Sequence, residues 1–412
     1  MTMRLKLYTL LCTSFLFLFT ACNQDDNPVP TEKVTRTVLV YIMADNSLSS
    51  FASADIEEMM KGMETVDASL YNLLVYVDDA TKESSPDYYV SPTLYRLSKD
   101  KSGKVVKEII KEYKEQVSTD PLVMQEVMKR AFAEYPAESY GLVLWSHGDG
   151  WIPSPLPVVS RTSTRWIGQD TTNGTTYLNI ADIASVLSEF PRFDFILFDA
   201  CFGQTIEVAY ELRNCAEYII GSPTEIPGPG ASYEKVVPAM FKGNNVGMEI
   251  GRAYYEPYEA QYTGTIPSNN YHWTGGVSIA VVNCAALDEL ASVTRQTISE
   301  VELSMLLNSN IYNYDKRNKY NKDYVGYYDM KQLMQQLSTN IDAWTSAANN
   351  AIIYWKSTPK NYSGIILSMF ALPQETTCGV THYIPTPDAP AATVAYQSTA
   401  WYSAAGLDKI GW

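Results

Sequence analysis

Histidine and cysteine are scarce in this sequence, and basic residues are fewer than acidic ones. The 412 residues include three histidines and six cysteines, and no cysteines stand in a C-x-x-C arrangement. Zinc sites are usually built from clusters of these residues, so no metal centre is expected. The formal net charge is -15 at pH 7, with 31 Lys and Arg against 46 Asp and Glu. Nucleic-acid binding needs a basic face, so a nucleic-acid partner is not expected.

A run of apolar residues long enough to cross a membrane is also missing. The longest such run near the N-terminus covers residues 7–19, follows Arg4 and Lys6, and precedes Thr20-Ala21-Cys22. This pattern is typical of a signal peptide rather than of a membrane span. Small residues before a cysteine resemble the lipobox of bacterial lipoproteins. We therefore expect residues 1–21 to be a lipoprotein signal peptide, although ordinary secretion is the alternative.

The resemblance to a lipobox also predicts where the protein is found. Lipid attached to the sulfur of Cys22 would anchor an exported protein in the bacterial outer membrane or at the cell surface, with no other membrane contact. Residues 22–36 are polar and contain Asp and Pro, so they are expected to form a flexible tether. The remaining residues, 37–412, are expected to form one large domain. An exported domain of this size needs no disulfides.

Short apolar runs alternate with helical patterns along residues 37–412. Strands are expected at 37–43, 72–77, 94–97, 140–145, 195–198, 218–221, 277–282 and 364–370. Helices are expected after 47, 120, 179, 205, 287, 329 and 340, the last with an apolar stripe from Ile341 to Trp355. This alternation indicates an α/β fold around a mainly parallel sheet, with extra helices and strands toward the C-terminus.

Two of the expected strands end in residues that can do chemistry. The first is followed by Ser146-His147-Gly148, and the second by Asp199-Ala200-Cys201-Phe202-Gly203. Both strands are continuous apolar runs, as expected of strands buried on both faces. If they are parallel neighbours, His147 and Cys201 lie at the carboxyl edge of the sheet, where open α/β sheets bind their ligands.

These residue types suit acyl transfer through a cysteine. A thiolate is the reactive form of cysteine, and a helix expected shortly after Cys201 would favour negative charge there. The backbone N–H groups of Cys201 and Gly148 could bind the oxyanion of a tetrahedral intermediate, and His147 could carry the proton. A buried cysteine at a strand end is more often inert packing.

Together the two motifs resemble the clostripain family of cysteine peptidases, which belong with caspase-like and gingipain-like enzymes. The resemblance continues at residues 40–48 and 327–329, with Met330 where the family has Leu, and so covers most of residues 37–412. It implies a caspase-like α/β/α sandwich, a Cys201–His147 dyad, and cleavage of peptides or proteins after a basic residue. No cofactor is expected, although calcium is possible. Some relatives use calcium, but the sequence contains no Ca-binding loop motif.

Two acidic residues are candidates for binding a basic substrate side chain. Asp199 lies two residues before Cys201, so in an extended strand both point to the same side. Its carboxylate could bind Arg or Lys, or could instead hold nearby loop N–H groups. Glu225 is the second candidate, in a loop with three prolines and two glycines between 222 and 230, where it could instead cap the loop.

A long irregular segment between the two motifs is a candidate for self-processing. Residues 153–176 are rich in Pro, Ser, Thr and Gly and include Arg161 and Arg165. Loops of this length are usually functional or mobile. The family is known to process itself, so the resemblance suggests cleavage after Arg161 or Arg165. A plain surface loop is the alternative.

The sequence thus predicts a cysteine endopeptidase that cleaves after Arg or Lys. One alternative is a surface lipoprotein that keeps the fold, binds other molecules and has lost catalysis. Another is a cysteine hydrolase of non-peptide amides. The intact His147 and Cys201, each followed closely by a glycine, favour the peptidase.

Overall fold

The computed structural model describes residues 34–79, 91–153, 166–172, 174–270, 272–298, 310–316, 326–387 and 389–412. Within these residues the centre is a nine-stranded sheet with the order β12-β10-β9-β8-β5-β1-β2-β3-β4. The five middle strands are parallel: β9 (Ala216–Gly221), β8 (Phe193–Asp199), β5 (Ala137–Trp145), β1 (Val34–Ala44) and β2 (Tyr71–Asp79). Antiparallel strands extend both edges: β3 (Thr93–Lys99) and β4 (Val105–Glu112) on one side, β10 (Ser278–Asn283) and β12 (Ile352–Ser357) on the other.

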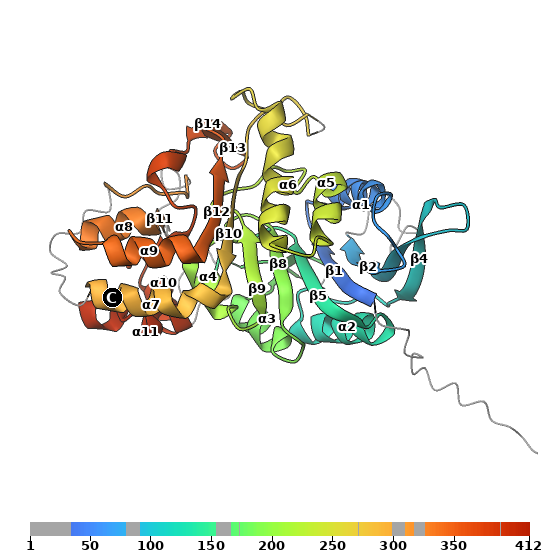
Figure 1. Cartoon of the computed structure of the whole chain (residues 1–412), viewed down its shortest axis with the longest axis horizontal. Helices are drawn as coiled ribbons and strands as arrows, with labels where there is room; N and C mark the ends of the chain where they lie inside the picture. The colour runs from blue at the N-terminus through green and yellow to red at the C-terminus, as the bar shows by residue number, and fades with distance from the viewer. Residues whose placement is uncertain are drawn as a thin grey trace, which may run out of the picture.

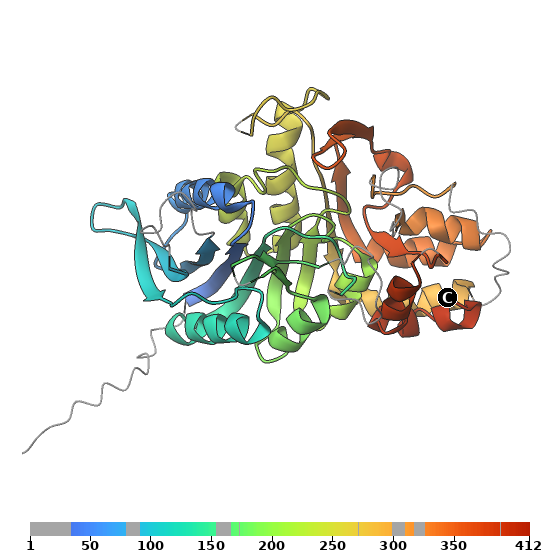
Figure 2. The ribbon, with the colours of Figure 1, turned by 180° about the vertical axis from the view of Figure 1, so that it is seen from behind.

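Helices cover both faces of this sheet. One face packs against α1 (Ser49–Met63), α5 (Tyr233–Met240) and α6 (Val246–Gln261) (Figure 1). The other packs against α2 (Pro121–Glu134), α3 (Ile180–Leu187) and α4 (Ile206–Glu211) (Figure 2). The middle strands are buried on both faces because each face has its own hydrophobic core. The expected α/β/α sandwich around a mainly parallel sheet is therefore confirmed.

The C-terminal part of the chain adds a second group of helices beyond the β12 edge (Figure 1). These are α7 (Leu287–Ile298), α8 (Met330–Leu337), α9 (Asp342–Ala351), α10 (Pro390–Gln397) and α11 (Ala400–Ala404), with 3-10 turns at Cys284–Ala286, Gln374–Thr376 and Leu407–Ile410. Three two-stranded ladders accompany the main sheet: β11 (Tyr327–Asp329) with β15 (Thr381–Tyr383), β13 (Lys360–Ser363) with β14 (Ser368–Ala371), and β6 (Gln169–Asp170) with β7 (Thr176–Tyr177). These helices extend one of the two cores of the sheet, so they belong to the same packed body.

Two sequence predictions in this region are wrong. The apolar stripe predicted one helix as far as Trp355, but α9 ends at Ala351 and the next residues pair with β10 as strand β12. Four β-branched or aromatic residues in a row, 352–355, favour the extended conformation and override the helical spacing. The strand predicted at 364–370 is instead the turn and second strand of the β13–β14 hairpin.

The first strand begins earlier than the sequence pattern predicted. It starts at Val34, so the last residues assigned to the tether belong to the sheet. Arg36 is buried there, forms an ion pair with Asp194 at 2.5 Å, and donates to the Met240 carbonyl at 2.7 Å. A buried cation fixed by a carboxylate and a carbonyl ties the start of β1 to β8 and α5.

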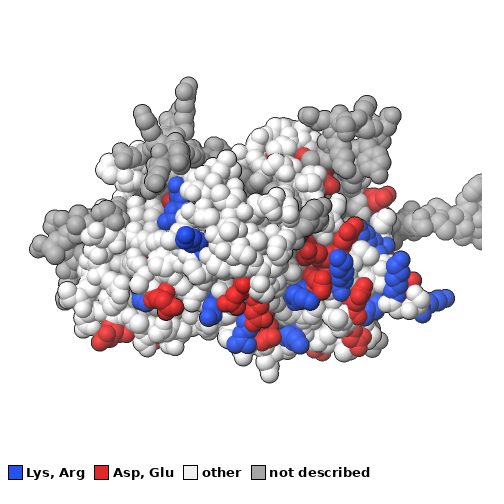
Figure 3. Space-filling view, turned by 90° about the horizontal axis from the view of Figure 1, so that it is seen from above, with Lys and Arg blue, Asp and Glu red and all other residues white. Residues whose placement is uncertain are grey.

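The charged residues form no continuous basic surface on the face seen from above. Lys and Arg side chains there are interspersed with Asp and Glu and gather mainly toward one side (Figure 3). This distribution agrees with the net charge of -15. Among the described residues, no helix is both long enough and apolar enough to span a membrane.

Candidate active site

The two strands that carry the sequence motifs are parallel neighbours. In their ladder Trp145 of β5 pairs with Asp199 of β8, so His147 and Cys201 each lie two residues beyond the last pair. Gly148, just after His147, packs closely against the turn that carries Cys201. A Cβ atom on this glycine would lie 2.6 Å from the Cys201 carbonyl oxygen, which leaves no room for a side chain. The sheet therefore brings His147 and Cys201 to the same edge, as the sequence predicted.

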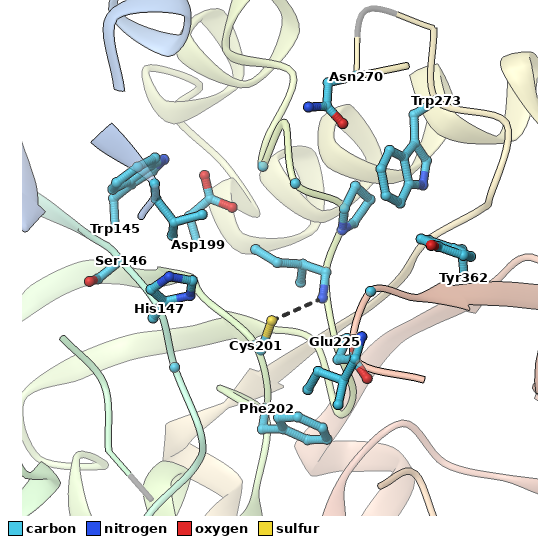
Figure 4. A pocket seen from close by; sticks show the side chains of 18 residues that line it. Trp145, Ser146, His147, Asp199, Cys201, Phe202, Glu225, Asn270, Trp273 and Tyr362 are labelled. Carbon is cyan, nitrogen blue, oxygen red and sulfur yellow. Dashed lines mark hydrogen bonds between the residues drawn. The ribbon is translucent and has the colours of Figure 1, made fainter. Parts of the chain in front are cut away.

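Both side chains face one pocket of about 420 Å³ (Figure 4). Its floor contains Trp145 and Asp199, and its walls come from the loop after β9, the loop before β10 and the β13–β14 hairpin. The residues contributed by these walls are Glu225, Ile226, Pro227, Gly228, Gly230, Asn270, Trp273, Tyr362, Gly364 and Ile365. The pocket is mainly apolar with acidic groups at the floor and wall, so it suits a long side chain with a cationic end.

The turn after β8 fixes the position of Cys201. Its Sγ accepts a hydrogen bond from the Ile226 N–H at 3.4 Å. Phe202 follows in the left-handed conformation, with φ of 56°, is buried, and stacks on Tyr327. A non-glycine residue in this conformation is strained, and such strain is often found at functional turns. Helix α4 begins only at Ile206, where the Thr205 side chain caps it, so its first turn lies beyond the turn that carries Cys201.

His147 contacts a residue that the sequence analysis did not assign to the site. Its Nε2 lies 2.8 Å from the Oγ of Ser47, which follows the end of β1. Ser47 lies just before α1, but no side chain caps this helix at its N-cap residue, Leu48. Because β1 is parallel to β5, its end lies at the same sheet edge, and this topology was the available signal. Burial lowers the pKa of His147, so the imidazole is neutral at neutral pH.

Asp199 lies at the floor of the pocket and is fixed by three donors. Its carboxylate accepts from the Ala231 N–H at 3.0 Å and from the hydroxyls of Tyr233 at 2.7 Å and Tyr254 at 2.9 Å. Only 2% of Asp199 is exposed, and burial raises its pKa, although these hydrogen bonds oppose the rise. Gly230, in a left-handed conformation, lies so close that a Cβ there would be 2.8 Å from the carboxylate. The two roles predicted for Asp199 are thus compatible in this geometry.

A second carboxylate is buried behind the pocket floor. Asp55 of α1 accepts from the indole N–H of Trp145 at 2.7 Å. Burial, with a smaller contribution from Asp199, raises the pKa of Asp55 to about 9. Asp55 is therefore protonated at neutral pH, and Asp199 does not face a second full charge. The sequence analysis did not assign Asp55 to the site.

Glu225 lines the pocket, but its carboxylate accepts hydrogen bonds from the β13–β14 hairpin. It is 7% exposed, and its carboxylate accepts from the Ser363 hydroxyl at 2.6 Å and the Ile365 N–H at 3.4 Å. These contacts bridge the loop after β9 and the hairpin, which together form one wall. The structure therefore gives Glu225 a position from which it holds that wall.

Other predicted features lie elsewhere or outside the described residues. Cys22, Arg161 and Arg165 fall outside the residues that the structure describes. Within the described chain, the four cysteines form no disulfide, and no group of three or more His, Cys, Asp or Glu side chains is arranged to hold a metal ion. His382 is fully buried, accepts from the Trp401 indole N–H, and has its pKa lowered by burial to about 4. His382 is thus part of the core.

The fold and the site define a class: a cysteine peptidase built on an α/β/α sandwich. The clostripain family profile matches residues 40–403, which is most of the chain. The chain therefore belongs to the clostripain family.

Several known proteins are similar to this chain. Clostripain from Hathewaya histolytica is 27% identical over 231 residues, and the aligned region is 52% of this chain but only 43% of that protein. A secreted C11 cysteine protease from Bacteroides thetaiotaomicron, solved with an irreversible peptide inhibitor, is 42% identical, with a TM-score of 0.80 over 91% of this chain and all of the other. An inactive zymogen C11 protease from Parabacteroides distasonis is 30% identical, with a TM-score of 0.75 over 92% of this chain and 99% of the other.

Proposed function

We propose that this chain is a cysteine endopeptidase that cleaves peptide bonds after Arg or Lys, with Cys201 and His147 as the catalytic dyad. The observation that carries the proposal is the common register of His147 and Cys201 beside one pocket with a fixed carboxylate at its floor. Membership of the clostripain family supports it.

The proposed reaction has two steps. The Cys201 thiol gives its proton to His147, and Sγ attacks the scissile carbonyl carbon, with the oxyanion held by the N–H groups of Gly148 and Cys201. The C–N bond breaks, and His147 passes the proton to the leaving amine. Water then attacks the thioester and restores the thiol, which releases the second product.

Fluorogenic peptides ending in Arg or Lys test this function. We expect the wild-type protein to release the fluorophore, and Cys201→Ala and His147→Ala each to lose at least about 1000-fold in kcat/KM. Equal release by the two variants and the wild type would contradict the proposal. A processed protein that is folded but cleaves no peptide would favour the alternative of a binding lipoprotein without catalysis.

We also propose that residues 153–176 are cut by the protein itself, after Arg161 or Arg165. The similar Parabacteroides distasonis protein is described as an inactive zymogen, which supports a processing step here. N-terminal sequencing of the wild type and of Cys201→Ala tests this. We expect a new N-terminus inside the loop for the wild type alone; identical intact chains would contradict it, and cleavage of both would indicate another protease.

Export with lipid on Cys22 is a separate proposal, supported by residues 1–22 and by the secreted relative from Bacteroides thetaiotaomicron. Mass spectrometry of the mature protein tests it. We expect a lipid-modified cysteine at the N-terminus and its loss in Cys22→Ser.

A further inference from the structure

Among the described residues, Ser47 forms a side-chain hydrogen bond with the His147 ring, with its Oγ 2.8 Å from Nε2. We propose that Ser47 is a positioning residue: its Oγ accepts a hydrogen bond from the Nε2–H of His147 and so leaves the lone pair on Nδ1. This inference rests on the proposed function for its role in catalysis. The tautomer itself can be tested without turnover.

The loop that carries Ser47 is fixed by its neighbour. The buried Asn46 donates through Nδ2 to the carbonyls of Met43 at 2.9 Å and Gln169 at 2.8 Å. Its Oδ1 accepts from the Leu48 N–H at 2.9 Å. Asn46 thus fixes both sides of Ser47 to the ends of β1 and β6. A hydroxyl on a fixed loop can orient an imidazole at a lower entropic cost than one on a mobile loop.

The residue before the histidine reinforces this arrangement. Ser146 Oγ donates to the Met43 carbonyl at 2.8 Å and accepts from the Gln169 N–H at 3.2 Å. The ends of β1 and β5 are therefore connected by side chains as well as by their ladder. The separation between Ser47 and His147 is set by the sheet, and does not depend on a flexible loop.

The proposed direction of the hydrogen bond follows from what the dyad needs. A neutral imidazole carries one proton, so the nitrogen that takes the thiol proton must hold a lone pair. With Nε2 engaged by Ser47, Nδ1 is the nitrogen left for Cys201 and the leaving amine. Nδ1 then takes the thiol proton, and the Nε2–H to Ser47 bond persists in both the neutral and the cationic ring. A serine does this without the negative charge that an aspartate brings in a Ser-His-Asp triad.

Asp199 and Glu225 line the same pocket as His147, and Asp45 and Asp149 lie two residues from Ser47 and His147 along the chain. Asp45, two residues before Ser47, accepts from the Thr171 hydroxyl, Asp199 is held by Tyr233 and Tyr254, and Glu225 by Ser363. The backbone carbonyl of Asp149 accepts from the Tyr327 hydroxyl. None of these contacts takes the place of Ser47 at Nε2.

Nitrogen-15 NMR of the imidazoles in Cys201→Ala tests the tautomer directly. The chain has three histidines, so the His147 signals can be assigned by comparison with His147→Ala. We expect a protonated Nε2 and an unprotonated Nδ1 at neutral pH. The opposite tautomer would mean that Ser47 donates, and would overturn the proposal.

A pH titration of the same signals gives a second test. The proposed bond is stronger in the cationic ring, so removing it in Ser47→Ala should lower the pKa of His147. If Ser47 donated to the neutral ring, the same substitution would raise this pKa. An unchanged pKa would show that Ser47 does not act on the ring, and also overturns the proposal.

Kinetics then test the role in turnover. We expect Ser47→Ala to lower kcat by roughly 10-fold with little change in KM, and Ser47→Thr, which keeps the hydroxyl, to restore most of it. Ser50→Ala, an exposed position in α1, is the matched control. Full activity of Ser47→Ala would overturn the positioning role. A wild type that cleaves no peptide would count against the proposed function alone, since the NMR tests remain valid.

Discussion

At the scale of single residues, the site consists of a few side chains whose orientations are fixed by hydrogen bonds from loops. Cys201 receives the Ile226 N–H, and Asp199 receives two tyrosine hydroxyls and a backbone N–H. Such donors stabilise the charged form of a buried carboxylate. Burial has still removed its hydration, so the carboxylate stays charged only when a bound ligand compensates for that loss. A guanidinium or ammonium group in the pocket would do so.

Asp199→Asn tests this interpretation of the pocket floor. The amide keeps the shape but not the charge, so we expect kcat/KM for substrates with Arg before the scissile bond to fall by about 100-fold. Substrates with the neutral isostere citrulline should be cleaved equally by the wild type and the variant. If Asp199→Asn lowers the rate for both substrates alike, the residue is structural and does not bind the basic side chain.

The placement of His147 and Cys201 at one sheet edge could be predicted from the sequence, because each follows a buried strand that consecutive apolar residues identify. Ser47 and Asp55 could not be assigned, since each acts through a contact with a residue about 90 to 100 positions away along the chain. Single-sequence patterns carry no signal for such contacts unless the strand order is known. The contact between Glu225 and Ser363 could not be predicted for the same reason.

At the scale of elements, the pocket wall depends on how one hairpin is held. The β13–β14 hairpin meets the loop after β9 through Glu225, and its tip exposes 56% of Ile365 toward solvent. Trp273 packs edge-on against Tyr362 on the same wall. Correct placement of this hairpin was beyond the sequence because its two strands are short and its turn, 364–367, is as apolar as a strand.

Glu225→Gln and Ser363→Ala separate the two roles considered for Glu225. If it holds the hairpin, both variants should raise KM by a similar factor, roughly 3- to 10-fold, because each removes the same contact. The double variant should then be little worse than either single one. If Glu225 binds the substrate, only Glu225→Gln should change the preference between Arg and Lys peptides. Progress curves for matched Arg and Lys peptides provide the measurement.

At the scale of the whole molecule, burial of acidic groups behind the site makes stability depend on pH. Burial, and then Asp199, raises the pKa of Asp55 to about 9, whereas an aspartate in an unfolded chain titrates near 3.9. Between these values the folded protein keeps a proton that the unfolded chain releases. The contribution of Asp55 to stability is therefore complete below about pH 4 and is lost progressively as the pH rises toward 9.

Asp55→Asn removes this titration while it keeps an acceptor for the Trp145 indole. We expect the unfolding free energy of the variant minus that of the wild type, both measured with urea, to increase as the pH rises from about 5 to about 9. Asp182→Asn, on α3 across the sheet, is the control and should show a constant difference. The same constant difference for Asp55→Asn would contradict the expectation.

The close contact at Gly148 also limits which substitutions can change the spacing of His147 and Cys201. No larger residue fits at this position without displacing the Cys201 backbone. The backbone therefore sets the distance between the imidazole and the thiol, apart from rotation about the side-chain torsions of His147 and Cys201. Engineering that aims to bring the two groups nearer should therefore target the residues that set those torsions.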